Sequence, residues 1–204
     1  MTIYLHHNDL PADVVFQGDL AIDSETLGLL PQRDRLCVVQ LSDGQGDAHL
    51  VKFDGHDYSA PNLVTLLNDQ HRVKIFHYAR FDIAVLRAYL GVQINPIFCT
   101  KIASKLVRTY TDRHGLKDLC LEMLGIELSK VQQSSDWGAP VLSDEQQTYA
   151  ASDVLHLHEL RDQMVSRLAR EHRTHLAQAS FNFLPTRAEL DLIGWESMDI
   201  FSHR

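Results

Sequence analysis

The chain has 204 residues, of which 45% are hydrophobic and 23% charged, and its 19 Lys and Arg against 27 Asp and Glu give a formal net charge of −8. Apolar residues are spread along the whole length, which excludes global disorder and predicts a single domain over residues 1–204. Proteins that grip long nucleic acids usually carry a basic surface. The acidic balance therefore indicates either no nucleic acid or a ligand with few phosphates.

The sequence also indicates where the protein works. No apolar run approaches the roughly 18 residues of a membrane span, and residues 1–10 lack the basic-then-apolar pattern of an export signal. Cys37, Cys99 and Cys120 lie far apart, so neither a disulfide framework nor a zinc knuckle is expected. We therefore expect a cytoplasmic protein with reduced thiols and no membrane contact.

The first part of the chain predicts strands. Three stretches share a short apolar, β-prone pattern: Asp19–Asp23 with Val14–Phe16 before it, Leu36–Leu41, and Ala48–Phe53. The connections between them, Pro31–Arg35 and Ser42–Asp47, are short and polar. Short polar connections join neighbouring antiparallel strands, so these three are predicted to form an antiparallel meander.

The rest of the chain predicts helices around one short strand, Val73–Phe76. Apolar residues recur at helical spacing in six stretches: Asn62–Asn68, Arg80–Leu90, Thr100–Val107, Leu116–Leu124, a long stretch from Ser143 towards Arg173, and Thr174–Trp195. Ser143 followed by Glu145 and Gln146 is an N-cap signature, and Pro185 is expected to break the last helix. This order predicts an α/β fold with a mixed sheet flanked by helices.

Four acidic residues stand at element ends or share a helix face. Asp23 and Glu25 end the first strong strand, where residues two apart point to the same side and both carboxylates can reach one cation. Asp82 begins a helix, and Tyr149 and Asp153 lie one turn apart on another. Each has an ordinary alternative: a solvated strand end, an acid favoured by the helix dipole, and a surface Tyr–Asp pair.

Taken together, Asp23-x-Glu25, Phe81-Asp82 and Tyr149-x-x-x-Asp153 resemble the three motifs of the DEDD 3′–5′ exonucleases, and the tyrosine marks the DEDDy branch. Further stretches are similar to the ribonuclease D group: Thr100–Leu106, Gly115–Leu119, Ser134–Trp137 and Leu142–Asp153. The resemblance runs from about Asp19 to Arg161 and implies a ribonuclease H-like sheet, with the antiparallel meander joined by parallel strands.

The length of the chain favours one subgroup of this family. About 50 residues follow Asp153, too few for the extra helical nucleic-acid-binding domains of ribonuclease D proper. The chain is therefore most similar to the short bacterial nanoRNases of the NrnC type, which cleave dinucleotides. A helical extension over about residues 174–204 is rich in large apolar groups, which either cover the domain's own core or form a subunit interface. The resemblance implies a homo-oligomeric ring such as an octamer.

The resemblance also implies the chemistry. Hydrolysis of a phosphodiester by two divalent cations about 3.5–4 Å apart requires hard oxygen ligands, which suit Mg²⁺ or Mn²⁺. Asp23 is expected to bridge both ions, Glu25 and Asp153 to complete one, and Asp82 to hold the other largely through water. Tyr149, with an ordinary pKa near 10, is a poor base, so we expect it to align the attacking water.

Substrate contacts are expected at a further set of residues: Thr26, Leu27, Gly28, Leu29, His77 and Phe81. Leu27 or Leu29 is either a wedge against bases or part of a buried turn, and Phe81 either stacks on a base or lies in the core. His77 is expected to bond a ribose hydroxyl, although the family often has Asn there. A 5′-phosphate cap is expected from Lys130, Gln133 and Ser135, and the histidine pair His172 and His175 is expected to be solvated rather than metal-binding.

The function predicted from these residues is a two-metal-ion 3′–5′ exoribonuclease that hydrolyses dinucleotide-sized RNA to nucleoside 5′-monophosphates. One alternative keeps the same chemistry and acts on longer substrates, either by ribonuclease D-like 3′ trimming of RNA or on DNA. Another is a non-catalytic nucleic-acid-binding module on the same fold, which would tolerate loss of any of the five motif positions. All five are present.

Overall fold

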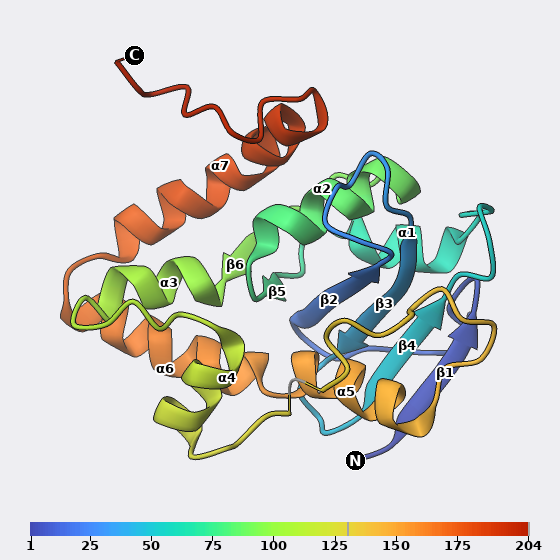
Figure 1. The fold of residues 1–204 in the computed structure, drawn as a ribbon. Helices are drawn as coiled ribbons and strands as arrows, with labels where there is room; N and C mark the ends of the chain where they lie inside the picture. Colours follow the sequence, from blue (N-terminus) through green and yellow to red (C-terminus); the bar gives the residue numbers. More distant parts are fainter. Residues whose placement is uncertain (130, 204) are drawn as a thin grey trace.

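The structure is a computed structural model that describes residues 1–129 and 131–203. Its centre is a six-stranded sheet with the strand order β1-β4-β3-β2-β5-β6 (Figure 1). The strands are β1 Ile3–His7, β2 Leu20–Thr26, β3 Leu36–Ser42, β4 Ala48–Lys52, β5 Lys74–Phe76 and β6 Ile97–Cys99. Strands β2, β3 and β4 pair antiparallel as predicted, and the pairs β1–β4, β2–β5 and β5–β6 are parallel. The prediction of a mixed sheet is confirmed.

Two strands escaped the prediction. Strand β1 carries two histidines among its five residues and lies at the edge of the sheet beside β4, whereas β6 has three residues. Val14–Phe16, which was expected to be β-prone, is not a strand. Phe16 is nevertheless buried, and its ring packs edge-on against His49 with the two ring centroids 5.0 Å apart. The apolar residues of Val14–Phe16 therefore reflect a partly buried loop rather than a strand of the sheet.

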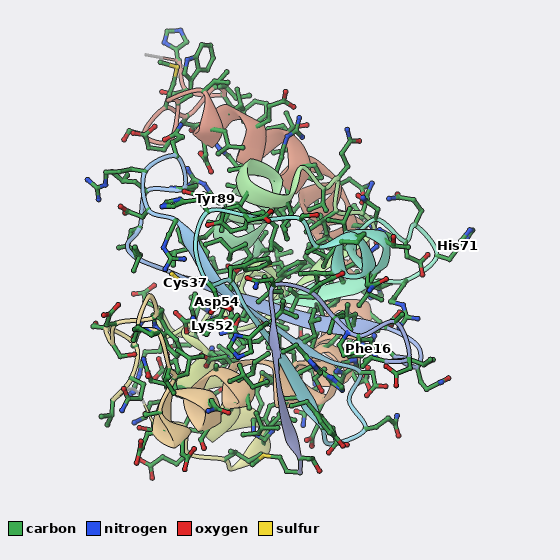
Figure 2. The ribbon with its side chains drawn as sticks, turned by 90° about the vertical axis from the view of Figure 1, so that its right-hand side faces the viewer. Phe16, Cys37, Lys52, Asp54, His71 and Tyr89 are labelled. Carbon is green, nitrogen blue, oxygen red and sulfur yellow. The ribbon has the colours of Figure 1, made fainter. Side chains whose placement is uncertain are left out.

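Helices cover both faces of the sheet: α1 Pro61–Leu67, α2 Ala79–Leu90, α3 Thr100–Val107, α4 Leu116–Leu119, the π-helical turn η1 Cys120–Leu124, α5 Asp144–Leu155, α6 Leu157–Arg170 and α7 Thr174–Leu192. The larger apolar cluster lies between the sheet and helices that include α1, α2, α3, α6 and α7. The smaller cluster joins β3 and β4 to α5 through residues such as Val38, Leu50 and Ala150. Cys37 belongs to this smaller cluster, and Figure 2 labels it together with Lys52 and Asp54, whose Nζ and Oδ1 lie 2.8 Å apart.

The expected long helix from Ser143 towards Arg173 is wrong, because the chain turns at His156, where α5 ends and α6 follows. No proline or glycine marks the turn. Ala150 of α5 packs in the smaller cluster, whereas Leu157 and Leu160 of α6 pack in the larger one. The chain turns here because α5 packs in the smaller cluster and α6 packs in the larger one. The cause of the turn is therefore tertiary packing.

The expected break at Pro185 is also wrong, because α7 continues through it. A proline inside a helix removes one backbone hydrogen bond and crowds the preceding turn. Phe181, Leu184 and Ala188 on either side are buried, and α7 packs along α2. This burial holds the helix together across the proline.

The start of α5 follows the prediction. Ser143 Oγ accepts from the Gln146 backbone N–H at 3.2 Å, and Gln146 Oε1 accepts from the Ser143 N–H at 2.9 Å, which is a capping box. This fixed start sets the rotation of α5 about its axis and therefore which side chains face the sheet. Across residues 1–129 and 131–203, the structure holds no helix that is both long and apolar enough to cross a membrane.

Candidate active site

Strand β2 directs Asp23 and Glu25 to the same face of the sheet. In the antiparallel register with β3, Asp23 lies opposite Gln40 and Glu25 opposite Val38. Val38 packs with Ala150 of α5 in the smaller cluster, so this face of the sheet is the one that α5 covers. Both carboxylates therefore point towards α5, as the alternation of strand residues predicts.

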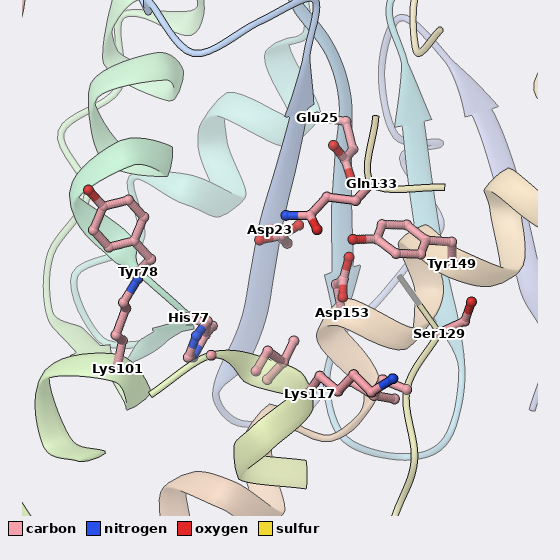
Figure 3. A pocket seen from close by; sticks show the side chains of 13 residues that line it. Asp23, Glu25, His77, Tyr78, Lys101, Lys117, Ser129, Gln133, Tyr149 and Asp153 are labelled. Atoms are coloured by element: carbon pink, nitrogen blue, oxygen red, sulfur yellow. The ribbon is translucent and has the colours of Figure 1, made fainter. Parts of the chain in front are cut away.

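The carboxylates of Asp23, Glu25 and Asp153 converge. One oxygen from each lies within 4.8 Å of the others, and Figure 3 shows them around a common space with the Tyr149 hydroxyl alongside. Asp82, in the first turn of α2, is 3% exposed and lies behind this group, where its Oδ1 accepts from the Ser24 hydroxyl at 2.7 Å. Four acids spread over 130 positions of the chain thus meet where β2, α2 and α5 come together.

Burial and mutual repulsion dominate the electrostatics of this cluster. Burial raises the pKa of Asp23 well above its ordinary range, and the charges of Asp82, Asp153 and Glu25 raise it further. Burial, followed by the charges of Asp153 and Asp82, raises the pKa of Glu25 in the same direction. The pKa values of Asp82 and Asp153 are also raised, chiefly by burial, and hydrogen bonds from Ser24 and Tyr149 respectively act against that rise.

Tyr149 keeps its proton in this setting. Burial raises the pKa of its phenol well above the usual value, and the charges of Asp153, Glu25 and Asp23 add to the effect. A phenol that stays protonated can donate a hydrogen bond but cannot act as a general base at neutral pH. The expected role of Tyr149 in aligning the attacking water remains a prediction.

The cluster has the chemistry of a divalent-cation site. Four carboxylates supply hard oxygen ligands of the kind that Mg²⁺ and Mn²⁺ prefer. Among the described residues, no Lys or Arg forms an ion pair with any of the four. The repulsion between them therefore calls for positive charge from outside the chain, which two divalent cations supply.

Asp23, Glu25 and Asp153 line a cavity of about 300 Å³, which basic and polar side chains also line. These side chains include His77, Tyr78, Lys101, Lys117 and Gln133, which are labelled in Figure 3. Lys101 Nζ lies 4.0 Å from the centroid of the Tyr78 ring, so the ammonium is held over an aromatic face. The cavity therefore separates negative charge on β2 and α5 from positive charge on α3 and α4.

Tyr78 and Lys101 were missed from the sequence. Tyr78 precedes α2 in the left-handed conformation, with φ 68° and ψ 43°, which is a strained choice for an aromatic residue. No pattern of residues in the sequence predicts such backbone angles at Tyr78. Lys101 stands in a stretch that was recognised as similar to ribonuclease D, but one of the two lysines there carries no signal of its own.

The turn after β2 shows why Gly28 is a glycine. A Cβ at Gly28 would lie 2.2 Å from Asp34 Oδ2, so only glycine allows this approach. Asp34 Oδ2 also accepts from the Leu30 N–H at 2.9 Å, and the Thr26 hydroxyl donates to the Gly28 carbonyl. Leu27 and Leu29 are 53% and 82% exposed, so neither is a buried turn residue, and the wedge remains a prediction.

The other expected substrate contacts are distributed unevenly. His77 lines the cavity, with Nδ1 2.9 Å from Thr100 Oγ1, and burial lowers its pKa to about 3, which keeps the ring neutral. Phe81 is half-buried against the larger cluster and lines a neighbouring cavity with Leu29 instead. Both contacts stay predictions, the second with less support from the geometry.

The residues that were expected to cap a 5′-phosphate also lie in different places. Gln133 lines the cavity, but Ser135 Oγ accepts from Gln146 Nε2 at 3.0 Å and so supports the start of α5. Lys130 lies outside the described residues. Within the described ranges, Asp23, Glu25 and Asp153 alone meet the distance requirement for a metal site, and His172 and His175 do not.

Comparison with known proteins agrees with this geometry. Residues 7–169 match a family profile described as a 3′–5′ exonuclease. The chain is 33% identical over 154 residues to ribonuclease D from Gluconacetobacter diazotrophicus, covering 76% of this chain and 39% of that protein. It is 37% identical over 145 residues to DNA polymerase I from Aquifex aeolicus, covering 71% of this chain and 23% of that protein. The chain thus spans about two fifths of the length of the ribonuclease D relative.

Solved structures match over the whole chain. Brucella melitensis NrnC with bound Mg²⁺ is 57% identical with a TM-score of 0.95, and the same protein bound to pGG is 57% identical with a TM-score of 0.96; each match covers 100% of both chains. Escherichia coli RNase D, at 24% identity and a TM-score of 0.73, covers 84% of this chain and 45% of that one, and shows the shared ribonuclease H-like fold. The chain therefore belongs to the 3′–5′ exonuclease family, with ribonuclease D and NrnC among its relatives.

Proposed function

We propose that this chain is a two-metal-ion 3′–5′ exoribonuclease that hydrolyses dinucleotide-sized RNA to nucleoside 5′-monophosphates. The observation that carries the proposal is the convergence of Asp23, Glu25 and Asp153 within 4.8 Å in one cavity, with Asp82 behind them. A non-catalytic nucleic-acid-binding module would gain nothing from four neighbouring carboxylates. Their mutual repulsion lowers the stability of the folded protein, and their negative charge does not attract phosphate.

Asp23, Glu25 and Asp153 would hold the ions directly, with Asp82 as the fourth carboxylate. When bound, two divalent cations make an attacking water more acidic and stabilise the charge that develops on the leaving 3′-oxygen. The chain's own contribution is to hold these four oxygen donors in place. Ser24 fixes Asp82 by its hydrogen bond, and the capped start of α5 fixes Asp153.

Tyr149 would orient the attacking water. Its hydroxyl retains its proton because the pKa is raised by burial and by the neighbouring carboxylates, so it can donate to an oxygen of the reacting group or share a water with Asp153. His77, whose ring is neutral, faces the same cavity. A neutral imidazole can donate to or accept from a sugar hydroxyl without adding charge.

The proposal of a very short substrate has four supports. The cavity of about 300 Å³ is at the lower end of the range for small-ligand sites. The chain's net charge is −8, which disfavours a long polyanion. NrnC, similar over its full length, has been solved with pGG, which has the size of a dinucleotide. Lys101 and Lys117 on the cavity wall suit one or two phosphates rather than a long backbone.

Product analysis on a ladder of 5′-labelled RNAs, from two to ten nucleotides, tests the proposal. With Mg²⁺ or Mn²⁺ we expect the dinucleotide to disappear orders of magnitude faster than the ten-mer, and with EDTA we expect no hydrolysis. Asp23→Asn should abolish hydrolysis with folding intact. Asp13→Asn, which changes an exposed acid outside the cluster, is the matched control and should keep full activity. Hydrolysis by Asp23→Asn at the parental rate would exclude this site.

A second candidate function uses the same chemistry on longer substrates. The similarity to ribonuclease D and to a DNA polymerase I supports 3′ trimming of longer RNA, or activity on DNA. The same ladder, run with RNA and with DNA of identical sequence, separates the two. Equal rates on two-mers and ten-mers would favour trimming, and equal rates on both sugars would favour a general exonuclease.

We further propose a cytoplasmic homo-oligomer, with a ring such as an octamer as its form. Large apolar side chains after α7 are exposed on the isolated chain: Ile193, Trp195, Met198, Ile200 and Phe201. Exposed apolar patches of this kind are typical of subunit contacts. Cys37, Cys99 and Cys120 are unpaired and buried, as expected in a reducing compartment. Light scattering after gel filtration would measure the assembly, and a monomer at micromolar concentration would refute it.

A further inference from the structure

Gln40, in the middle of β3, has a buried amide without a partner. The side chain is fully buried, and within the described part of the chain neither Nε2 nor Oε1 makes a hydrogen bond. Buried polar groups in folded proteins are nearly always hydrogen-bonded, because a lost bond to water must be replaced. An apolar side chain of the same size would fit this site at no such cost. The amide is therefore expected to have a partner in some state of the protein.

The position of Gln40 identifies that partner. In the β2–β3 register Gln40 lies directly opposite Asp23, and in the β3–β4 register it lies opposite Leu50. Directly opposed residues of antiparallel strands project to the same face with Cβ atoms about 5 Å apart. Gln40 therefore stands beside the acidic cluster on the face covered by α5, and its nearest cross-strand neighbours are a carboxylate and a leucine.

The other aspartates of the cluster already have side-chain donors. Asp82 accepts from the Ser24 hydroxyl, and Asp153 accepts from the Tyr149 hydroxyl. Asp23 receives a hydrogen bond from the Ser24 backbone but none from a side chain of the described residues. The cluster thus contains one aspartate that lacks a side-chain donor and, directly across the strand pair, one amide that lacks an acceptor.

We infer that Gln40 is a positioning residue for Asp23: its Nε2 donates to the Asp23 carboxylate when divalent cations occupy the cluster, and so fixes the oxygens that face the cations. The inference rests on the proposed function, because it requires the acidic cluster to bind metal. Carboxylates that bind metals are usually held by such outer hydrogen bonds, and losing one weakens metal affinity by about 10- to 100-fold. Asp23 is the carboxylate on which Asp82, Asp153 and Glu25 all act, so its orientation affects the whole group.

Gln40→Met tests the inference, because methionine keeps the length and volume of the side chain and removes both polar atoms. Calorimetric titration of the substrate-free protein with Mn²⁺ measures the metal affinity directly. We expect the Kd for Mn²⁺ to rise about tenfold or more. In EDTA, the variant should melt at the parental temperature or above it, because an unpaired buried amide has been removed. Weaker metal binding without loss of stability is a result that a merely structural residue would not give.

Leu50→Met is the matched control, since it alters packing on the other side of Gln40 and leaves every polar atom in place. It should bind Mn²⁺ with the parental affinity. If Gln40→Met does not fold, Gln40→Asn replaces it; asparagine keeps the amide but withdraws it by one methylene, and the Kd should again rise about tenfold.

Three results would be decisive against the inference or its basis. A Gln40→Met protein that binds Mn²⁺ within twofold of the parent overturns the positioning role. A Leu50→Met protein that loses as much affinity as Gln40→Met overturns it too, because packing would then be the cause. A parental protein that binds no Mn²⁺ at millimolar concentration contradicts the proposed function itself, which distinguishes the two failures.

Discussion

Asp153→Asn tests whether the buried negative charge of the acidic cluster lowers the stability of the metal-free protein. Burial raises the pKa of Asp153 to about 7, and the charge of Asp82 adds to the rise. Asparagine has the same size, and its carbonyl oxygen can still accept from the Tyr149 hydroxyl, so the substitution removes mainly the charge. We expect the variant to be inactive with Mg²⁺ and yet, in EDTA at pH 8, more stable than the parent.

The magnitude follows from the pKa. A folded-state value of about 7 against the ordinary 3.8 corresponds to about 4 kcal/mol, because one unit of pKa is worth about 1.4 kcal/mol. Since the folded pKa is raised, the protonated carboxyl contributes its full stability below the unfolded pKa near 4, and this contribution is lost as the pH rises through about 7. The advantage of Asp153→Asn should therefore be about 2 kcal/mol at pH 5 and approach about 4 kcal/mol at pH 8.

Urea unfolding followed by circular dichroism, in EDTA at pH 5, 6, 7 and 8, measures this difference. His77, whose lowered pKa removes stability as the pH falls below about 6.5, is present in both proteins and cancels when one is subtracted from the other. With saturating Mn²⁺ the parent should gain more stability than the variant. The reasoning is refuted if the stability difference does not grow with pH, or if Asp153→Asn is the less stable protein at pH 8.

Three further predictions concern single side chains. Tyr149→Phe should slow single-turnover hydrolysis about a hundredfold while the calorimetric Mn²⁺ affinity stays at the parental value; an unchanged rate would remove the phenol from the reaction. Lys101→Met should raise the steady-state KM for a dinucleotide about tenfold, or about 1.4 kcal/mol, with kcat retained, and a fall in kcat alone would contradict a binding role. Arg108→Met should cost about 2 kcal/mol in urea unfolding, because the buried guanidinium donates to Ser104 and to the Arg113 carbonyl, and it should leave Mn²⁺ affinity intact.

The acidic residues of the site were predictable because their placement depends on local periodicity. Asp23 and Glu25 share a strand face, and Tyr149 and Asp153 share a helix face, whatever the rest of the fold does. Local pattern also predicted the meander of β2, β3 and β4. The resemblance then supplied what local pattern cannot, namely that Asp82, far away in the sequence, joins the same group.

The features that escaped prediction depend on tertiary contacts. The turn at His156 arises because α5 and α6 pack into different clusters, and α7 crosses Pro185 because its neighbours are buried. The left-handed Tyr78 and the lysine above its ring are likewise products of packing around the cavity. No periodicity in the sequence encodes these, since each is decided by residues far away in the chain.

Three unfavourable features occur together around one cavity. The carboxylates of β2 and α5 repel one another, the Gln40 amide has no hydrogen-bond partner among residues 1–129 and 131–203, and Tyr78 holds a strained backbone angle. Strain and unpaired polar groups collect at functional sites because a bound ligand relieves them. Divalent cations would relieve the repulsion and bring Asp23 within reach of Gln40. Because bound cations would keep these carboxylates deprotonated in the folded state, as they are in the unfolded state above about pH 5, the metal-bound protein should unfold with a weaker dependence on pH than the metal-free one. The same groups that destabilise the empty site would then be the source of its affinity for metal.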